Sequence, residues 1–285
     1  MRIAYLGTSP FAAGVLERLA AGGHEVVLVV TRPDRPAGRG RRVQSPAVAD
    51  AARALGLALT QPEDVNAPEA RAEITAAAPD LLFVCAFGAL VRQELLDAHE
   101  VLNVHPSLLP RWRGAAPVER AIMAGDAETG ACIMRLTAGL DSGPVCARAV
   151  EPIRPDDTYG SLAPRLEALG STLLLEALDA RPPFEEQPED GVTYAEKLGP
   201  ADRTLDLTRP AAENDRVVRA LTPHVGARLE LGEGGGFLGI RATRVTDAGE
   251  LELVEVQPAG GRPMAYAEWL RGAGSPVPGV AAPEA

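Results

Sequence analysis

Through the first 180 residues, short apolar segments alternate with longer segments whose apolar residues recur at helical spacing. The predicted strands cover residues 2–6, 25–30, 81–86, 101–105, 131–136 and 145–150, and the predicted helices cover residues 11–21, 46–55, 68–77, 116–124 and 161–178. Alternation of this kind favours parallel strands joined by right-handed crossovers. Strands that are apolar at nearly every position are typical of a sheet covered on both faces. Residues 1–180 are therefore expected to form an α/β domain with a doubly wound, mainly parallel sheet.

A change of composition marks the end of this pattern. Residues 181–200 are rich in Pro, Glu and Asp and lack apolar periodicity, which is typical of a linker. Beyond them, a short helix is predicted over residues 216–221, and strands over residues 228–231, 237–244 and 251–256. Residues 201–271 are therefore expected to form a small β-rich domain, and residues 272–285 a disordered tail.

Composition narrows the class of protein further. A net charge of −11 argues against general nucleic-acid affinity through a basic surface. The three cysteines, Cys85, Cys132 and Cys146, include no C-x-x-C pair, so buried thiols are expected and neither a disulfide framework nor a zinc site. The chain enters its first strand without a charged-then-apolar leader, and no apolar run approaches the ~20 residues that span a bilayer. These features predict a reduced, cytoplasmic setting.

The turn after the first predicted strand reads Leu-Gly-Thr-Ser-Pro at residues 6–10. Parallel-sheet proteins often bind phosphates at this place. The turn has neither the G-x-G-x-x-G of a dinucleotide site nor the G-K-[ST] ending of a P-loop. An NAD-linked dehydrogenase or an ATP-binding fold is therefore disfavoured, and a tight turn that feeds a helix is expected, with ligand contact left open.

A dense basic segment follows the second predicted strand. Residues 32–42 contain one aspartate and five arginines: Arg32, Arg35, Arg39, Arg41 and Arg42. Two prolines and two glycines exclude a regular helix, so a loop is expected. The segment is either a solvated charge run or a flexible loop that binds the phosphates of a large polyanionic substrate.

Asn103 and His105 lie two residues apart at the end of a predicted strand, so both side chains project from the same face. Pro106 ends that strand, which places the pair at the carboxyl edge of the sheet, where open α/β sheets bind ligands. A carboxamide beside an imidazole can stabilise an oxyanion and transfer a proton. The alternative is a structural pair at a strand end.

Asp141 lies between glycines in a loop that follows the next predicted strand. In isolation, an aspartate in such a loop is a turn former. Near the end of a neighbouring strand, it can instead orient His105 or accept a proton from an attacking nucleophile. Together, Asn103, His105 and Asp141 predict the transfer of a small acyl group.

A run of motifs resembles the folate-dependent formyltransferase superfamily. The motifs are N-x-H (103–105), S-L-L-P-R-W-R-G-A-A-P (107–117), G-L-D-S-G (139–143), D-R-P-A-G-R-G (34–40), G-D-A-E-T-G (125–130), T-Y-A-E-K-L (193–198) and Q-P-A-G (257–260). Together they extend over residues 1 to about 270 of the chain.

The resemblance implies 10-formyltetrahydrofolate as formyl donor and co-substrate, with no metal and no tightly bound cofactor. The residues it assigns to folate are Ser107, Leu108, Leu109, Pro110, Phe87 and Gly88. The implied acceptor is the α-amino group of methionine on initiator tRNA, for translation initiation. The residues it assigns to tRNA are Arg35, Arg39, Arg41 and Arg42. Asn103 and His105 would stabilise or protonate the oxyanion, and Asp141 would tune His105 and help to accept the amine proton.

The resemblance also implies an OB-like C-terminal barrel and a monomeric enzyme. Few residues separate the last two predicted strands, so the barrel is expected to be shortened. Two alternatives remain open. A glycinamide ribonucleotide or sugar-amine formyltransferase, or a formylfolate hydrolase, could share the Asn-His-Asp set but would have little use for the arginine loop. A binding module without catalysis would not need the intact set.

Overall fold

The computed structural model describes residues 1–37, 42–232, 236–273 and 277–281, and the chain forms two compact units. Unit 1 comprises Met1–Arg113, Gly130–Glu151 and Pro164–Tyr194, and unit 2 comprises Gly114–Thr129, Pro152–Ala163 and Ala195–Ala285. This division differs from the predicted boundary at residues 181–200. Gly114–Thr129 and Pro152–Ala163 lie within the predicted first domain but belong to unit 2. The chain thus leaves unit 1 and returns to it twice before the C-terminal segment begins.

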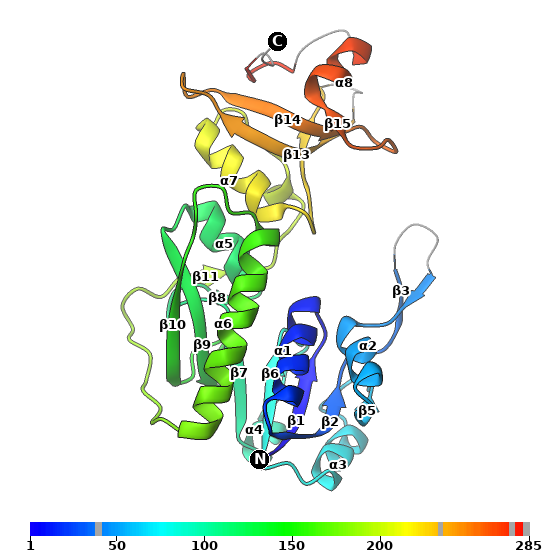
Figure 1. Ribbon diagram of the computed structural model, residues 1–285, viewed down its shortest axis with the longest axis vertical. Helices are drawn as coiled ribbons and strands as arrows, with labels where there is room; N and C mark the ends of the chain where they lie inside the picture. Colours follow the sequence, from blue (N-terminus) through cyan, green and yellow to red (C-terminus); the bar gives the residue numbers. More distant parts are fainter. Residues whose placement is uncertain (38–41, 233–235, 274–276, 282–285) are drawn as a thin grey trace. The chain divides into compact units, whose positions relative to one another are not determined.

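Unit 1 is built on a seven-stranded sheet with the order β10-β9-β7-β6-β1-β2-β5 (Figure 1). The strands are β1 (Arg2–Gly7), β2 (Glu25–Val30), β5 (Leu59–Thr60), β6 (Leu81–Cys85), β7 (Val101–His105), β9 (Glu128–Arg135) and β10 (Val145–Pro152). From β5 to β7 every pairing is parallel, and β9 runs antiparallel to β7. The sheet is mainly parallel, as predicted, and β9 is the strand that runs against β7.

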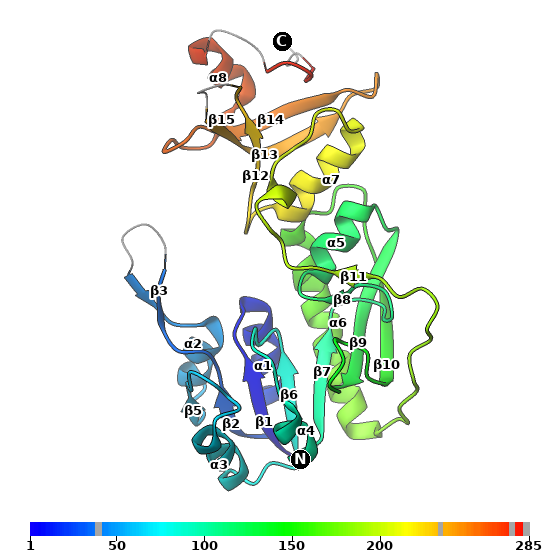
Figure 2. The same cartoon turned by 180° about the vertical axis from the view of Figure 1, so that it is seen from behind.

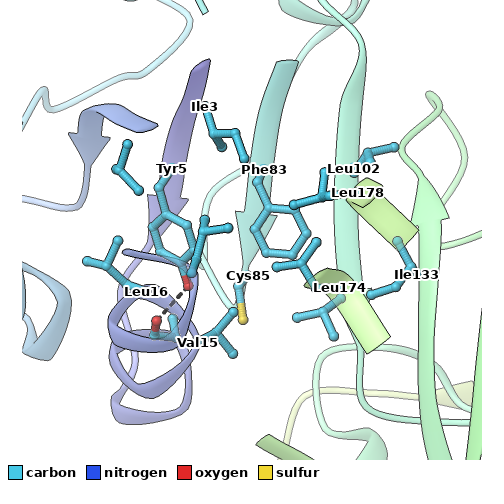
Figure 3. Packing of buried hydrophobic residues seen from close by; sticks show 14 of the residues in the cluster. Ile3, Tyr5, Val15, Leu16, Phe83, Cys85, Leu102, Ile133, Leu174 and Leu178 are labelled. Atoms are coloured by element: carbon cyan, nitrogen blue, oxygen red, sulfur yellow. Dashed lines mark hydrogen bonds between the residues drawn. The ribbon is translucent and has the colours of Figure 1, made fainter. Parts of the chain in front are cut away.

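Helices cover both faces of this sheet, which makes it doubly wound. One face carries α1 (Pro10–Ala21), α2 (Ala47–Ala54) and α6 (Tyr159–Ala180), and the other carries α3 (Pro68–Ala76) and α4 (Gln93–Ala98), as Figures 1 and 2 show. Alternate strand residues fill two cores: Tyr5 belongs to the first and Leu6 to the second. In the first core, the rings of Tyr5 and Phe83 lie 5.8 Å apart, and the Tyr5 hydroxyl donates to the carbonyl of Ala12 at 2.5 Å (Figure 3).

The turn between β1 and α1 is a capped helix start, as predicted. The Ser9 hydroxyl accepts the Ala12 amide hydrogen bond at 3.2 Å, and Pro10 occupies the first helical turn, where it disrupts no backbone hydrogen bond. The Thr8 hydroxyl donates to the carbonyl of Phe87 at 2.7 Å. The turn after β1 is therefore hydrogen-bonded to the segment that follows β6.

The arginine segment contains regular structure where only a loop was predicted. Strands β3 (Arg35–Ala37) and β4 (Arg42–Gln44) pair in an antiparallel ribbon, with Arg35 opposite Gln44 and Pro36 opposite Val43. Proline excludes a helix, but it is tolerated in a two-stranded ribbon with open edges. The segment is therefore a ribbon and not a loop, and it is still exposed, because Arg35, Val43 and Gln44 all face solvent.

Unit 2 contains a four-stranded antiparallel sheet in its described residues, with the order β12-β13-β14-β15. Its elements are α5 (Pro117–Ala124), the 3-10 helix η1 (Ala201–Arg203), α7 (Ala211–Leu221), β12 (Ala227–Glu230), β13 (Phe237–Val245), β14 (Leu251–Gln257), β15 (Met264–Ala265) and α8 (Tyr266–Ala273). The core includes Val218, Ile240 and Leu253, and Met123 of α5 packs against it. The antiparallel strands agree with the small, shortened barrel that was predicted.

The C-terminal residues 272–285 were expected to be disordered, but part of this segment is packed. Val277 is buried, and its amide donates to the Tyr266 hydroxyl at 2.9 Å. The Ala281 amide donates to the carbonyl of Leu251 at 2.8 Å. An isolated valine among Pro, Gly and Ala gives no periodic signal, although it can still fill a place in a core.

Two very short strands, β8 (Arg113–Gly114) and β11 (Tyr194–Ala195), pair with each other and were not predicted. No helix within the described part of the chain is both long and apolar enough to span a membrane.

Candidate active site

The carboxyl end of β7 presents two polar side chains on a buried strand. Leu102 and Val104 point into the first core, so Asn103 and His105 point to the opposite face of the sheet. Both are nearly inaccessible, at 7% and 4% exposure. Buried polar side chains at a strand end cost free energy unless they are paired, so their partners decide what the site can do.

The two ring nitrogens of His105 face different oxygen atoms. Nε2 lies 2.8 Å from the carbonyl oxygen of Trp112, and Nδ1 lies 3.7 Å from Oδ2 of Asp141. A carbonyl oxygen only accepts, so Nε2 carries the hydrogen of that bond. The Trp112 contact fixes the ring, and Nδ1 is the nitrogen that faces the carboxylate.

Asp141 reaches His105 from the loop after β9. Its backbone is left-handed, with φ of 43°, and its side chain is 15% exposed. Two residues later, a Cβ on Gly143 would collide with the carbonyl oxygen of Arg135, and the Arg135 amide donates to the carbonyl of Pro144 at 2.9 Å. Only glycine permits this close return of the loop to β9. A strained aspartate held against a buried histidine is typical of a functional site.

The thiol nearest to this pair by strand register is unsuited to nucleophilic catalysis. Cys132 on β9 pairs with His105 on β7. Burial raises the pKa of the Cys132 thiol to about 11, so it stays protonated near neutral pH. Cys132 is therefore unsuited to attack an acyl group near neutral pH.

Comparison with known proteins identifies the family. The family profile described as "Formyl transferase" matches residues 1–178, which include Asn103, His105 and Asp141. The methionyl-tRNA formyltransferase of Ruegeria pomeroyi is 44% identical over an alignment of 298 positions, gaps included, which covers 98% of each chain. The chain belongs to the methionyl-tRNA formyltransferase family.

Solved structures share the fold of this formyltransferase. Methionyl-tRNA formyltransferase from Clostridium thermocellum matches with a TM-score of 0.62 at 12% identity, over 93% of this chain and 99% of that one. An N-formyltransferase from Helicobacter canadensis, solved with folinic acid and dTDP-3-aminofucose, matches with a TM-score of 0.64 at 15% identity, over 86% of this chain and 88% of that one. At these identities the likeness concerns the fold alone.

The segment that the family resemblance assigns to folate follows β7 directly. Ser107 is fully buried, and its hydroxyl donates to the carbonyl of Arg111 at 2.6 Å, so this side chain closes the turn. Leu109 is buried beside Cys132, while Leu108 and Pro110 are half-buried. In this formyltransferase, Ser107 and Leu109 are buried and shape the segment, while Leu108 and Pro110 are partly accessible to solvent.

The second segment assigned to folate, Phe87 and Gly88, is fixed by residues that the sequence did not single out for that role. Phe87 is buried in the second core, while Gly88 is exposed with φ of 72°. The carbonyl of Phe87 accepts from Thr8, and that of Gly88 accepts from Nη1 of Arg32 at 2.9 Å. Arg32 is thus a support for this turn, separate from the rest of the basic segment.

Of the arginines assigned to tRNA, Arg35 is exposed and forms an ion pair with Glu63 at 2.6 Å, which contributes about 0–1 kcal/mol at such a site. Arg42 begins β4. Arg39 and Arg41 lie outside the described residues.

Other contacts of the site come from residues that sequence reasoning missed. The Trp112 amide donates to the Thr193 hydroxyl at 2.9 Å, and the Arg113 amide donates to the Thr193 carbonyl at 2.9 Å. Gln187 contacts the loop of Asp141. Thr193 lies in a family motif and Gln187 in a stretch without periodicity, so only the first had any signal in the sequence.

Proposed function

We propose that this protein transfers the formyl group of 10-formyltetrahydrofolate to the α-amino group of methionine on initiator tRNA, in the cytoplasm, for translation initiation. The observation that carries the proposal is the buried Asn103-x-His105 pair at the end of β7, with Asp141 held 3.7 Å from the His105 ring. The relative from Ruegeria pomeroyi, aligned over 98% of this chain, bears the corresponding name. The enzyme is proposed to act as a monomer, with the folate as a co-substrate.

In the proposed reaction, the free amine attacks the formyl carbon and forms the new carbon–nitrogen bond. The formyl oxygen takes up the electron pair and becomes an oxyanion. The Asn103 carboxamide can donate to this oxygen, and an oxyanion-hole donor of this kind typically contributes about 10²–10³ in kcat. Collapse of the intermediate breaks the bond between the formyl carbon and N10 of the folate, and N10 leaves with the electron pair.

The same reaction moves one proton from the attacking amine to the departing N10. Since Nε2 of His105 donates to Trp112, Nδ1 is the ring nitrogen that can exchange a proton. Asp141 faces that nitrogen and can accept the amine proton or orient the ring. Asp141 or Nδ1 of His105 can take up the amine proton, and the protonated group can then pass it to N10 as the folate leaves.

The two substrates are assigned to different parts of unit 1. Residues 87–88 and 107–110 are proposed to hold the folate. The arginine ribbon is proposed to hold tRNA phosphates, because a cluster of net charge +4 in a chain of net charge −11 suits a polyanion. Replacing Arg39, Arg41 and Arg42 by Ala is expected to raise KM for the tRNA and flatten its salt dependence, while leaving KM for the folate unchanged.

The direct test offers two acceptors to the purified enzyme with 10-formyltetrahydrofolate: methionyl initiator tRNA and glycinamide ribonucleotide. We expect formylation of the tRNA alone, and loss of that activity in a His105→Ala preparation made in parallel. Preferential formylation of the ribonucleotide would assign the chain to a different acceptor. Release of formate without any amine acceptor would instead indicate a hydrolase.

A further inference from the structure

Gln187 uses every hydrogen-bonding position of its side-chain carboxamide within unit 1. Its Nε2 donates to the carbonyl of Asp141 at 2.8 Å and to the carbonyl of Gly143 at 2.7 Å. Its Oε1 accepts from Nε and Nη2 of Arg113 at 3.0 and 2.8 Å. Carbonyl oxygens accept and guanidinium nitrogens donate, so only one orientation of the amide fits all four partners.

The two carbonyls belong to the loop whose geometry places Asp141. That loop has a left-handed backbone at Asp141, which is unfavourable for a residue other than glycine and persists only where surrounding contacts hold it. Gly143 returns the loop to β9, and Gln187 holds the loop on both sides of Ser142. Since Gln187 lies 46 positions away in the sequence, this support is tertiary and not local.

The oxygen of the same Gln187 carboxamide binds the side chain of Arg113, which belongs to the segment that contacts His105. Arg113 follows Trp112, whose carbonyl oxygen accepts from Nε2 of His105. Gln187 and Arg113 therefore join the loop that carries Asp141 to the segment that fixes His105. No contact of Gln187 with the histidine ring or the aspartate carboxylate is needed for this link.

We propose that Gln187 is a positioning residue for formyl transfer, which sets the separation of the Asp141 carboxylate and the His105 ring through its bridge to Arg113. The inference rests on the proposed role of Asp141 and His105 in catalysis. Gln187 does not touch the reacting atoms, because its donors and acceptors all go to the protein. Its loss would therefore reduce the chemical step and leave substrate binding almost unchanged.

The test is a double-mutant cycle between Gln187 and Asp141, measured as steady-state formyl transfer to whichever amine the wild-type enzyme accepts. Gln187→Glu keeps the size of the side chain and its acceptor for Arg113, but it places an oxygen against the two carbonyls. We expect kcat to fall about 30- to 100-fold, the scale of a misplacement of roughly 1 Å. KM for folate and for the amine should change less than about threefold, and the exposed neighbour Glu186→Gln serves as the matched control.

In an Asp141→Asn background, Gln187→Glu should lower kcat by less than about threefold, because the carboxylate it positions is already gone. An equal loss in both backgrounds, or an unchanged kcat in the wild-type background, would overturn the proposal. If Gln187→Glu unfolds, as judged by thermal unfolding and circular dichroism, the same cycle with Gln187→Met decides. An inactive wild-type enzyme would refute the proposed function. If the wild-type enzyme is active but the substitutions at Gln187 and Asp141 have additive effects on kcat, only this inference is refuted.

Discussion

The two halves of the proposed catalytic set are held by different means. Asn103 and His105 sit on β7, a buried central strand with neighbours on both sides, so the sheet itself fixes their direction and spacing. Asp141 sits on a loop with a left-handed backbone, and its position depends on Gly143 and on side chains from distant parts of unit 1. The comparison shows that a strand can position a reactive pair through local sequence, whereas a loop residue needs partners that only the tertiary structure provides.

The largest expected effect comes from removing the negative charge of Asp141 while keeping the shape of its side chain. Asp141→Asn should lower kcat about 10²–10⁴-fold, because the variant can no longer accept a proton beside His105. Steady-state kinetics with both substrates measures this loss, and KM should stay within about threefold. A variant with wild-type kcat would show that only the strand half of the set takes part in the chemistry.

Gly143→Ala tests how narrowly the loop is confined. The added methyl group would collide with the backbone carbonyl of Arg135, so the loop must shift. Overpacking of this kind costs about 1–3 kcal/mol of stability, and the shift should reduce kcat roughly tenfold or more. Gly139→Ala is the matched control, because its methyl group would collide only with the hydroxyl of Ser142, which can rotate, and would touch Ser142 Cβ and Thr137 at ordinary contact distances. Equal effects of the two variants would contradict this account of the loop.

Thr193→Val probes the support on the histidine side. It removes the hydrogen bond from the Trp112 amide to the Thr193 hydroxyl, and the loss of one such bond costs about 0.5–1.5 kcal/mol. The unfolding midpoint should fall, and kcat should fall by about tenfold or less, because β7 still fixes His105. Thr193→Ser retains the hydroxyl and should behave like the wild type. A larger loss of kcat than in Asp141→Asn would show that His105, and not Asp141, depends more on tertiary partners for its position.

The smallest expected effect is a slow rate of cysteine labelling, which reports how rigid the strands around the site are. Burial raises the pKa of Cys132 to about 11 and that of Cys85 to about 12, so neither thiol ionises at pH 8. In native protein, iodoacetamide should modify the half-buried Cys146 first, and modification of the other two should rise only when the sheet opens in denaturant. Rapid labelling of Cys132 at pH 8, followed by mass spectrometry, would show that β9 opens beside His105.

The same contrast explains what the sequence can predict. The parallel strands and the Asn103-x-His105 pair follow from apolar periodicity and from the two-residue spacing of one face of a strand. The six-residue helix α4 (Gln93–Ala98) was missed because a helix of under two turns shows little periodicity. The composition of residues 181–200, which are rich in Pro, Glu and Asp and lack apolar periodicity, predicts a linker. Residues 181–194 instead belong to unit 1, and their contacts run through single side chains and backbone pairs, which leave no periodic pattern in the sequence. Phe184 and Gln187 illustrate this, since one packs against the first core and the other holds the loop of Asp141.

Asn103 and His105 on β7 are proposed to perform formyl transfer. This role is tested most directly by the single-turnover formylation rate of His105→Ala with bound methionyl initiator tRNA and saturating 10-formyltetrahydrofolate. We expect a rate at least about 100-fold below that of the wild type, with the Kd for the tRNA within about twofold. A single-turnover rate equal to that of the wild type would contradict it.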